Sequence, residues 1–566
     1  MPVTQISRDT RVINNAKTAA AGKFAEQLRE NSVNKEKGTF DSAAANDFIF
    51  DAVGQSESNV PATLQAVFDE VGQENSATIS RAILDGAAQY EAMHGAAVPA
   101  DVMEYAFHMA YGTTAEAKRI MALDSTANNN HADNLSLQPN RAVVAIYTAL
   151  IEAIPFAHYL PADIGSNEGK LAIVTHQAGN KFGLYAANAG MDGIGSGDPY
   201  ITSSRIHATT NSSGAHTGQL TSVQATRDTC AAVATGVVAV NLLRGRTQVY
   251  VNGRIVAREI SSSGSGASTV SGSVTIAGVT SQIAGTVNTD TGAIALTSSP
   301  ALADGVPVVV EGFLDYDRQP SLTPSVITNV ETFSVFAKPW RAYTQHSMEA
   351  QTQMSNELGL DPYSESLIAL QSQFANERYY EVLAKAMRLA AYGGNIGSFN
   401  MDWSTQGAQK GRADILQDLQ STLGVVSQQM AIDTMSHGVS HIYVGKYLAG
   451  MFLGLPSTIW QPSGVQTRPG IYRMGRLFNQ YDVYYTPKII TETSSASQML
   501  CIGRAPDVVR NPFVLGDAVP ATVVPLGVGV DLKRGAGFYA RNFTEVNPHG
   551  PSSMAAALIN VTNMGL

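Results

Sequence analysis

A stretch of about fifty residues in the middle of the chain differs sharply in composition from the segments on either side of it. Residues 251–300 hold 10 Ser, 7 Thr and 7 Gly, and only four charged side chains. Within it, Asn252-Gly253 lies between two β patterns, which is a strong signal for a two-residue type I′ hairpin. We therefore expect a small β-sandwich or barrel over residues 200–325, inserted into a larger fold. Its expected strands are Gln248–Val251, Arg254–Ala257, Val274–Ile276, Ala293–Leu296 and Val306–Val310, with a turn at Thr289–Gly292.

Helical patterns precede this β region. Apolar residues recur at helical spacing in residues 62–71, 79–93 and 103–123, with Gly and Pro between these segments. The polar stretch of about 40 residues before them is expected to be an extended arm. Toward the β region the pattern predicts a linker at Ser125–Pro139, a short helix at Arg141–Pro155, and two strands around an Ala-Gly-Asn turn in Lys170–Tyr185.

A long helix is predicted after the β region. Thr332–Arg341 has a strand pattern, and a helical pattern begins near Tyr343, is interrupted at Gly359–Pro362 and resumes through Ala391. At about 1.5 Å per residue, the second part is a rod of about 43 Å. One face of it is apolar and carries Ile368, Ala375, Tyr379, Val382, Ala386 and Leu389.

The last third of the chain alternates helix and strand patterns, which predicts an α+β arrangement. A helix is expected at Ile415–Met435. Strands are expected at His441–Val444, Gln480–Tyr485, Gln498–Ile502 and Val523–Val530.

Length and charge limit the classes of function. The 566 residues suggest three or four folding units, and the 44% hydrophobic residues are enough for a substantial core. A formal net charge of −10 gives no overall attraction to nucleic acid, so a dedicated DNA-binding protein is disfavoured. Only 15% of residues are charged, against the roughly 25% typical of soluble domains, which suggests that much of the surface contacts neighbours.

Two cysteines, Cys230 and Cys501, lie far apart, and the absence of CxxC excludes a Cys-based zinc site and a disulfide framework. A single Cys230–Cys501 bridge stays open, but two buried free thiols are the favoured interpretation. The N-terminus lacks the apolar region of a signal peptide, and no apolar run approaches about 18 residues. We expect synthesis in the cytoplasm and no contact with a membrane.

Three local patterns resemble sites of known chemistry. His437 and His441 lie four residues apart, but no HExxH Glu accompanies them, and a turn followed by a strand is the better interpretation. The glycines of residues 193–197 lack the surrounding strand and helix of a dinucleotide loop. Gly445-Lys446 is followed by Tyr where a phosphate loop needs Ser or Thr. We predict no metal site, and we interpret the glycines as structural.

The sequence shows no catalytic constellation. It has no G-x-S-x-G elbow and no pair of carboxylates that stands out as acid and base. We therefore predict no catalytic, cofactor-binding or metal-binding residues, no cofactor, and a protein that is not an enzyme. A hydrolase with a carboxylate pair assembled in space stays open. So does a surface glycan-binding, adhesin-like protein that uses the β domain, although residues 251–300 contain no Phe, Trp or Tyr.

The order of these elements resembles the major capsid proteins of tailed bacteriophages with the Hong Kong 97-type fold, and most closely the larger, myophage-type ones. Thr332–Leu383 is similar to their loop-to-spine segment, including the Gly-Leu-Asp turn at Gly359–Asp361. Pro139–Tyr185 is similar to their entry helix and outgoing loop strand. Gly537–Arg541, with Val546–Pro548, is similar to their C-terminal strand.

The resemblance implies a division of the chain into seven segments. These are an N-terminal arm and helical region at residues 1–138, a short helix and outgoing extended-loop strand at 139–199, the inserted β domain at 200–325, a returning loop strand at 326–345, a peripheral domain with a spine helix at 346–420, an axial domain at 421–520, and C-terminal return strands at 521–566.

It also implies a function. The chain would be a structural protein of the virion that self-assembles, as hexamers and pentamers, into the icosahedral head of a tailed double-stranded DNA phage. Its implied partners are cement or decoration proteins, the portal and the scaffold, with packaged DNA near it only non-specifically. Basic residues of the long helix and the strand before it are candidates for ion pairs with a neighbour's loop, namely Arg341, Arg378, Lys385 and Arg388.

Overall fold

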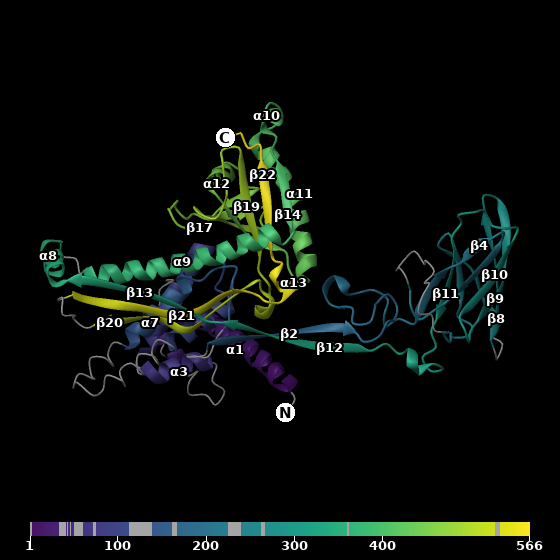
Figure 1. Cartoon of the computed structure of the whole chain (residues 1–566), viewed down its shortest axis with the longest axis horizontal. Helices are drawn as coiled ribbons and strands as arrows, with labels where there is room; N and C mark the ends of the chain where they lie inside the picture. The colour runs from purple at the N-terminus through teal and green to yellow at the C-terminus, as the bar shows by residue number, and fades with distance from the viewer. Residues whose placement is uncertain are drawn as a thin grey trace. The chain divides into compact units, whose positions relative to one another are not determined.

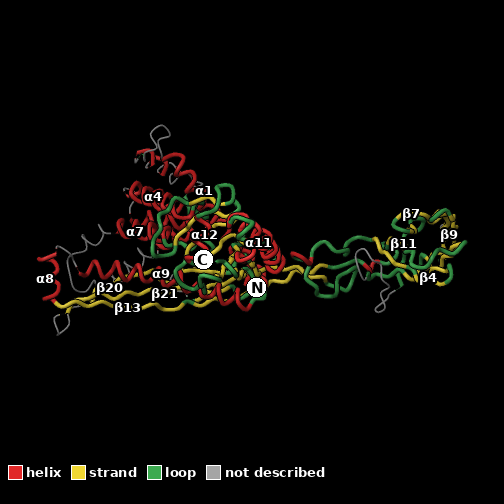
Figure 2. The backbone as a smooth tube through the Cα atoms, turned by 90° about the horizontal axis from the view of Figure 1, so that it is seen from above, coloured by secondary structure: helices red, strands yellow, loops and turns green. Residues whose placement is uncertain are grey.

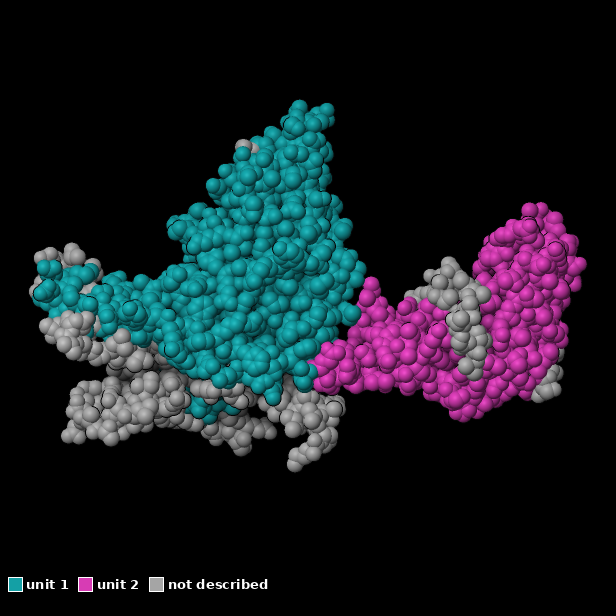
Figure 3. Space-filling view, in the orientation of Figure 1, with its two compact units in different colours: residues 1–173, 332–566 teal, residues 174–331 magenta. Residues whose placement is uncertain are grey.

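The computed structural model shows an α+β fold (Figure 1). Contacts divide the chain into two compact units, of which unit 1 comprises Met1–Ile173 and Thr332–Leu566 and unit 2 comprises Val174–Glu331 (Figure 3). Unit 1 is therefore discontinuous in sequence. The structure describes residues 3–32, 41, 43–45, 47–49, 60–71, 75–111, 138–160, 167–224, 239–261, 266–358, 362–526 and 533–565.

The N-terminal part of unit 1 is helical from its first described residue. The prediction of an extended N-terminal arm is wrong, because Val3–Ser32 form a 30-residue helix, α1. Ala21, Phe24 and Leu28 follow one another at spacings of three and four and are buried, so an apolar face stabilises this helix. The other helices are α3 (Ala62–Val71), α4 (Ser76–His94), one over residues 100–111, and α7 (Gln138–Ile151). Most of the expected linker lies outside the described residues.

A long helix packs on a four-stranded sheet. The predicted helix with Pro362 at its start is confirmed as α9, Pro362–Tyr392, and its buried face includes Val382, Leu383 and Ala386. It lies along the sheet in two perpendicular views (Figure 1, Figure 2). The sheet order is β1-β20-β21-β13, with β1 His158–Tyr159, β20 Phe513–Leu526, β21 Lys533–Val546 and β13 Lys338–Ser347.

The prediction that a helix begins near Tyr343 is wrong. Strand β13 continues to Ser347, because it pairs with β21 over its whole length, from Lys338 opposite Asn542 to Ser347 opposite Lys533. Helix α8 begins only at Met348 and ends at Leu358. The predicted turn at Gly359–Asp361 lies outside the described residues.

A second sheet of unit 1 has seven strands. Helix α11, Arg412–Thr434, covers it with Leu416, Leu419 and Leu423, which confirms the predicted helix. The short helices are α10 (Trp403–Gln406), α12 (Lys446–Leu453) and α13 (Gly550–Ser553). In spatial order the strands are β14 (Ile396–Asn400), β22 (Ala556–Thr562), β19 (Ala496–Gly503), β15 (Val439–Val444), β18 (Tyr481–Tyr485), β17 (Tyr472–Leu477) and β16 (Trp460–Pro462).

Two strands distant in sequence pair to form a ribbon. The hairpin expected within Lys170–Tyr185 is wrong, because β2, Glu168–Ala178, is one strand whose partner is β12, Val326–Phe336. Gly179 donates its N–H to the Ser325 carbonyl at one end, and Ala337 donates to Asn167 at the other, as in an antiparallel ladder. The boundaries between the two units fall within these strands.

Unit 2 is built on one nine-stranded sheet. Asn252 and Gly253 have φ of 49° and 76°, which confirms the predicted type I′ turn. The sheet curls until β3 approaches β5, where a side chain on Gly218 would collide with the His207 ring, so it is an open barrel rather than a sandwich. Its strands are β3 (Ser204–Ala208), β4 (Thr210–Ser212), β5 (Ala215–Gln219), β6 (Gln248–Val251), β7 (Arg254–Ser261), β8 (Ala267–Ile276), β9 (Val279–Asn288), β10 (Ala293–Ser299) and β11 (Val308–Phe313).

Candidate assembly surfaces

Strands β12 and β13 each have an edge that no other described strand covers. Strand β13 ends the order of its sheet, and β2 and β12 form a sheet of two strands only. Apolar side chains on these strands face outward: Phe336 of β12 is 62% exposed and Tyr343 of β13 is 73% exposed. A monomeric protein usually protects such edges with charge, proline or a covering element, because they pair readily with another chain. These edges are therefore candidate contact surfaces.

The ribbon of β2 and β12 is uncovered mainly along β12, because His176 and Ala178 of β2 are hydrogen-bonded to residues 188–191. Both strands are eleven residues long, and most side chains of β12 are exposed or half-buried. A two-stranded sheet is only marginally stable in water, and it needs a third strand or a packed face. The five-residue cluster of Leu160, Leu171, Val335, Val514 and Phe543 anchors one end of the ribbon, and Ala178 at the other end is part of the unit 2 core.

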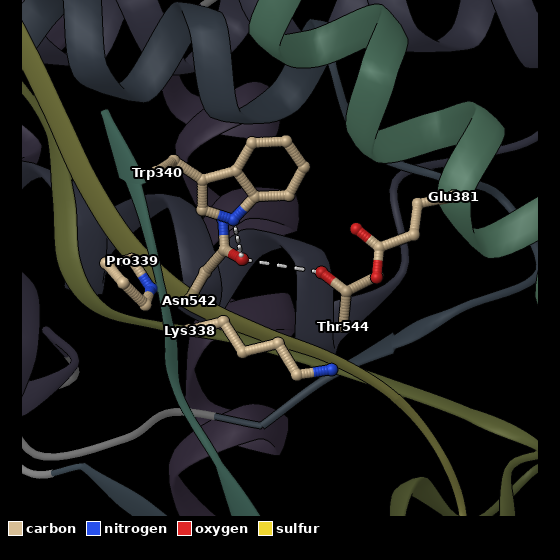
Figure 4. Close-up of a pocket in the computed structure, with 6 residues that line it drawn as sticks. All are labelled: Lys338, Pro339, Trp340, Glu381, Asn542 and Thr544. Carbon is tan, nitrogen blue, oxygen red and sulfur yellow. Dashed lines mark hydrogen bonds between the residues drawn. The ribbon is translucent and has the colours of Figure 1, made fainter. Parts of the chain in front are cut away.

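A cavity of about 230 Å³ lies where α9 passes over strands β13 and β21 (Figure 4). Its lining residues are Lys338, Pro339, Trp340, Glu381, Asn542 and Thr544. Trp340 donates its indole N–H to Asn542 Oδ1 at 2.8 Å, which fixes the orientation of the amide. The Nδ2 group of Asn542 has no hydrogen-bond partner, although this side chain is only 1% exposed.

The charges around this cavity are paired within the chain. Lys385 Nζ lies 2.7 Å from Glu381 and 3.7 Å from Glu545, and Lys338 forms an ion pair with Glu545. Lys385 also donates to the Thr544 carbonyl. The expectation that Lys385 pairs with a neighbour is therefore wrong, because three acceptors of its own chain surround it.

A buried ion pair joins α9 to the sheet beneath it. Arg378 donates to Asp517 Oδ2 at 3.3 Å from two nitrogens, and Tyr105 donates to the same oxygen. Burial opposes the charge of Arg378, but the adjacent Asp517 carboxylate outweighs it, and the pKa of the guanidinium lies above its ordinary value. The prediction that Arg378 forms an ion pair with a neighbouring subunit is therefore also wrong, because its charge is paired with Asp517 of the same chain. The Arg341 guanidinium lies 5.6 Å from the Tyr539 ring centroid, and Arg388 bonds to the carbonyl of Ala384 in its own helix.

Polar contacts also hold the N-terminal helices to the rest of unit 1. Asp101 lies 2.9 Å from His158 Nδ1 and accepts a hydrogen bond of 2.9 Å from Arg504. Burial works to raise the pKa of Asp101, but contact with His158 and Arg504 outweighs it and lowers that pKa. His94 Nδ1 lies 3.0 Å from the Tyr484 hydroxyl. Helices that sequence analysis treated as a separate region are part of the same folded body.

The two histidines singled out in the sequence belong to different segments of the fold. His437 lies in the connection between α11 and β15, and His441 lies in β15, as the turn-then-strand interpretation predicted. Burial lowers the pKa of His437 to about 4 and that of His441 to about 3. Among the described residues, no group of three or more His, Cys, Asp or Glu side chains is placed to bind a metal.

The glycine motifs have structural roles in the described chain. Residues 193–195 form one turn of 3₁₀ helix, η2. Gly445 begins α12, and the Glu492 carboxylate accepts hydrogen bonds from the N–H groups of Lys446 and Tyr447, where a phosphate loop would bind phosphate. A side chain on Gly445 would collide with that carboxylate.

Of the two cysteines predicted to be buried free thiols, Cys501 lies within the described residues and Cys230 does not. Cys501 is a buried free thiol, and burial raises its pKa to about 12, so it is unreactive at neutral pH. Cys230 lies outside the described residues. No helix in the described part of the chain is long and apolar enough to cross a bilayer.

No family model and no curated protein matches the chain, but solved structures do. The capsid of jumbo bacteriophage PhiKZ is 8% identical with a TM-score of 0.35, over 73% of this chain and 93% of that one. The capsid of Myoviridae phage XM1 is 10% identical with a TM-score of 0.28, over 43% and 78%. A structure from Microbacterium phage Oxtober96 is 13% identical with a TM-score of 0.29, over 42% and 77%.

Two of these neighbours are bacteriophage capsids, the class of protein that the sequence resembles. The uncovered edges of β12 and β13 are the surfaces from which we infer a function.

Proposed function

We propose that this chain is the major capsid protein of a tailed bacteriophage, which self-assembles into the icosahedral head around double-stranded DNA. The observation that carries the proposal is the outer edge of β12 in the two-stranded ribbon of β2 and β12, where no described strand pairs and most side chains are exposed or half-buried. Such a ribbon is stable only against another surface, and a shell built from many copies supplies one at every subunit. The ribbon is then the extended loop.

Under this proposal the remaining elements take the capsid roles. Helix α9 and the sheet of β20, β21 and β13 form the peripheral domain, with α9 as its spine helix. The seven-stranded sheet with α11 and α12 forms the axial domain. The open barrel of unit 2 is the inserted domain and lies on the outer surface of the shell. Hexamers and pentamers of the chain, cement proteins, the portal and the scaffold are its partners, and the virion is its location.

The two alternative functions have less support. In unit 2 the aromatic side chains of Phe182, Tyr185 and Tyr200 are buried in its core, so they are not available for stacking on a sugar. For a hydrolase, two buried carboxylates are already paired with cations: Asp101 contacts His158 and Arg504, and Asp517 contacts Arg378. Two others accept hydrogen bonds: Glu104 from the Thr63 hydroxyl and Glu259 from the Thr247 N–H. A structural role needs no free carboxylate.

Electron microscopy tests the proposal directly. Particles from the native source are expected to be uniform polyhedra, with a dominant gel band at the 59.9 kDa chain mass. The purified chain is expected to sediment as large closed particles at high concentration. A chain that stays monomeric in both preparations would contradict the proposal.

A surface variant ties assembly to the ribbon. Phe336→Ser removes an exposed apolar side chain of β12, so the subunit is expected to stay folded while assembly weakens about tenfold. Val279→Ser, at an exposed position of unit 2, is the matched control and is expected to assemble normally. If the two variants assemble equally well, the ribbon is not a contact between subunits.

A further inference from the structure

The last turn of α4 carries a histidine whose second ring nitrogen has no partner. His94 is half-buried, and its Nδ1 atom lies 3.0 Å from the Tyr484 hydroxyl of β18. The Nε2 atom is closed to solvent and has no hydrogen-bond partner. A neutral imidazole leaves one nitrogen as an acceptor, whereas a protonated imidazole carries an N–H group on both nitrogens. The contact therefore fits the neutral ring better than the charged one.

The charges around His94 also oppose its protonation. Arg473 of β17 lies against the end of α4, where a side chain on Gly95 would collide with its guanidinium. Arg468, in the segment before β17, adds a second positive charge, and the Asp482 carboxylate of β18 is already paired with Arg473 at 2.7 Å. Burial and the two arginines lower the pKa of His94 to about 4, although Asp482 acts in the opposite direction.

Three further rings complete the surroundings of His94. The Tyr90 ring centroid lies 4.5 Å from that of the imidazole, and the Tyr484 ring centroid lies 5.9 Å from it. His441 of β15 packs on the other contact of the Tyr484 ring, at 5.9 Å, and a charge on His94 acts on it. A helix C-terminus ordinarily favours a protonated histidine, but here Arg473 already occupies that position.

The same residues connect the N-terminal helices to the seven-stranded sheet. Helix α4 contacts β17 through its last turn, and it also packs on α1 and α7. Tyr90 and Tyr484 belong to the hydrophobic core that these helices share with the sheet. Separation of the end of α4 from the sheet would therefore expose the contact between these two parts of unit 1.

We propose that His94, with Tyr484 and Arg473, forms a pH-sensitive latch that holds α4 on the seven-stranded sheet at neutral pH and opens when His94 binds a proton. In the open state the imidazole is in water and titrates near its ordinary pKa of about 6.5. The latch is therefore fully stabilising above pH 6.5, and this stabilisation is lost as the pH falls toward 4. The inference concerns the free subunit and does not depend on the proposed function.

Hydrogen exchange of the full chain tests the latch. Helix α11 is the internal reference, because it packs in a separate hydrophobic cluster of unit 1. Between pH 7 and pH 5, the amide protection factors of α4 are expected to fall at least about tenfold more than those of α11. Equal changes in the two helices overturn the proposal.

Two variants assign the effect to His94. His94→Asn does not titrate and keeps an amide near the Nδ1 position, so its α4 is expected to lose no more protection than α11. His94→Gln is measured in the same way, so the result does not depend on one substitution. His346→Asn, at a half-buried histidine of β13 that contacts Ser366, is the matched control and is expected to behave as the parent. Persistence of the selective loss in the His94 variants also overturns the proposal.

Discussion

In unit 1, a buried arginine, Arg378, is paired with a buried aspartate, Asp517. Arg378, Asp517 and Tyr105 come from segments more than 100 residues apart in sequence, and they satisfy one another in a region closed to solvent. A buried ion pair contributes little net stability, but loss of one partner leaves an uncompensated charge. The positions of these residues in the sequence gave no indication that they meet.

Replacement of Asp517 with Asn is expected to lower the free energy of unfolding by about 3 kcal/mol, because Arg378 would stay buried without its carboxylate. Urea denaturation followed by circular dichroism measures the change. Asp418→Asn is the matched control, since the Asp418–Lys410 pair is exposed and its loss is expected to cost less than about 1 kcal/mol. Similar losses in both variants would show that burial of the pair is unimportant.

His441 is expected to make the fold sensitive to acid. The groups around it are Asp482, Arg504, His94 and Arg473, and burial is the largest cause of its low pKa of about 3. Since the unfolded value is about 6.5, the neutral imidazole stabilises the fold fully above pH 6.5, and this contribution is lost as the pH falls toward 3.

The measurement is the free energy of unfolding between pH 6.5 and 4.5. His441→Gln is expected to reduce its decline by about 2 kcal/mol, because Gln does not titrate. If the free energy of unfolding falls equally with pH in the parent and in His441→Gln, His441 is not the cause of the acid sensitivity.

At the scale of elements, local pattern predicted the helices better than the strands. The apolar face of α9 and its proline start lie within the helix itself, as does the face of α11 that packs on the seven-stranded sheet. The strands β2 and β13 depend on partners elsewhere: β12 is about 150 residues from β2, and β21 about 200 residues from β13. Consequently the predicted hairpin and the predicted start of the helix before α9 were both wrong.

Two positions of α9, one buried and one exposed, are expected to respond differently to truncation. Leu383→Ala removes a fully buried side chain and is expected to cost 2–5 kcal/mol of unfolding free energy, roughly as in other cores. Ile368→Ala, at a position that is 60% exposed, is expected to change it by less than about 0.5 kcal/mol. Thermal melts of both variants check this, and a small effect of Leu383→Ala would contradict the burial of that position.

At the scale of the whole molecule, the chain leaves unit 1 through β2 and returns to it through β12. Gly179 and Ser325 are hydrogen-bonded to each other at the far end of the ribbon, so a short connection is sufficient to join the two strands. The barrel of unit 2 has its own hydrophobic core, which includes Val249, Ile283 and Val310. Unit 1 therefore does not need unit 2 for its own core.

Replacement of residues 180–324 with Asn-Gly is expected to leave unit 1 folded, with β2 and β12 as a two-residue hairpin. The melting temperature of the unit 1 helices is the measurement, and it should stay within a few degrees of that of the full chain. The control joins the strands with a single residue, which disturbs the pairing register. An unfolded Asn-Gly variant would show that unit 1 depends on unit 2.

The sequence by itself determined the features that depend on nearby residues. These include the type I′ turn at Asn252-Gly253, the α9 and α11 helices, and the absence of an HExxH or CxxC motif. Only the tertiary structure decided that β2 pairs with β12, that Arg378 and Lys385 are paired within the chain, and that Asn542 has a donor without a partner. The reason is physical: strand pairing and burial arise from contacts between distant segments, which a local pattern does not encode.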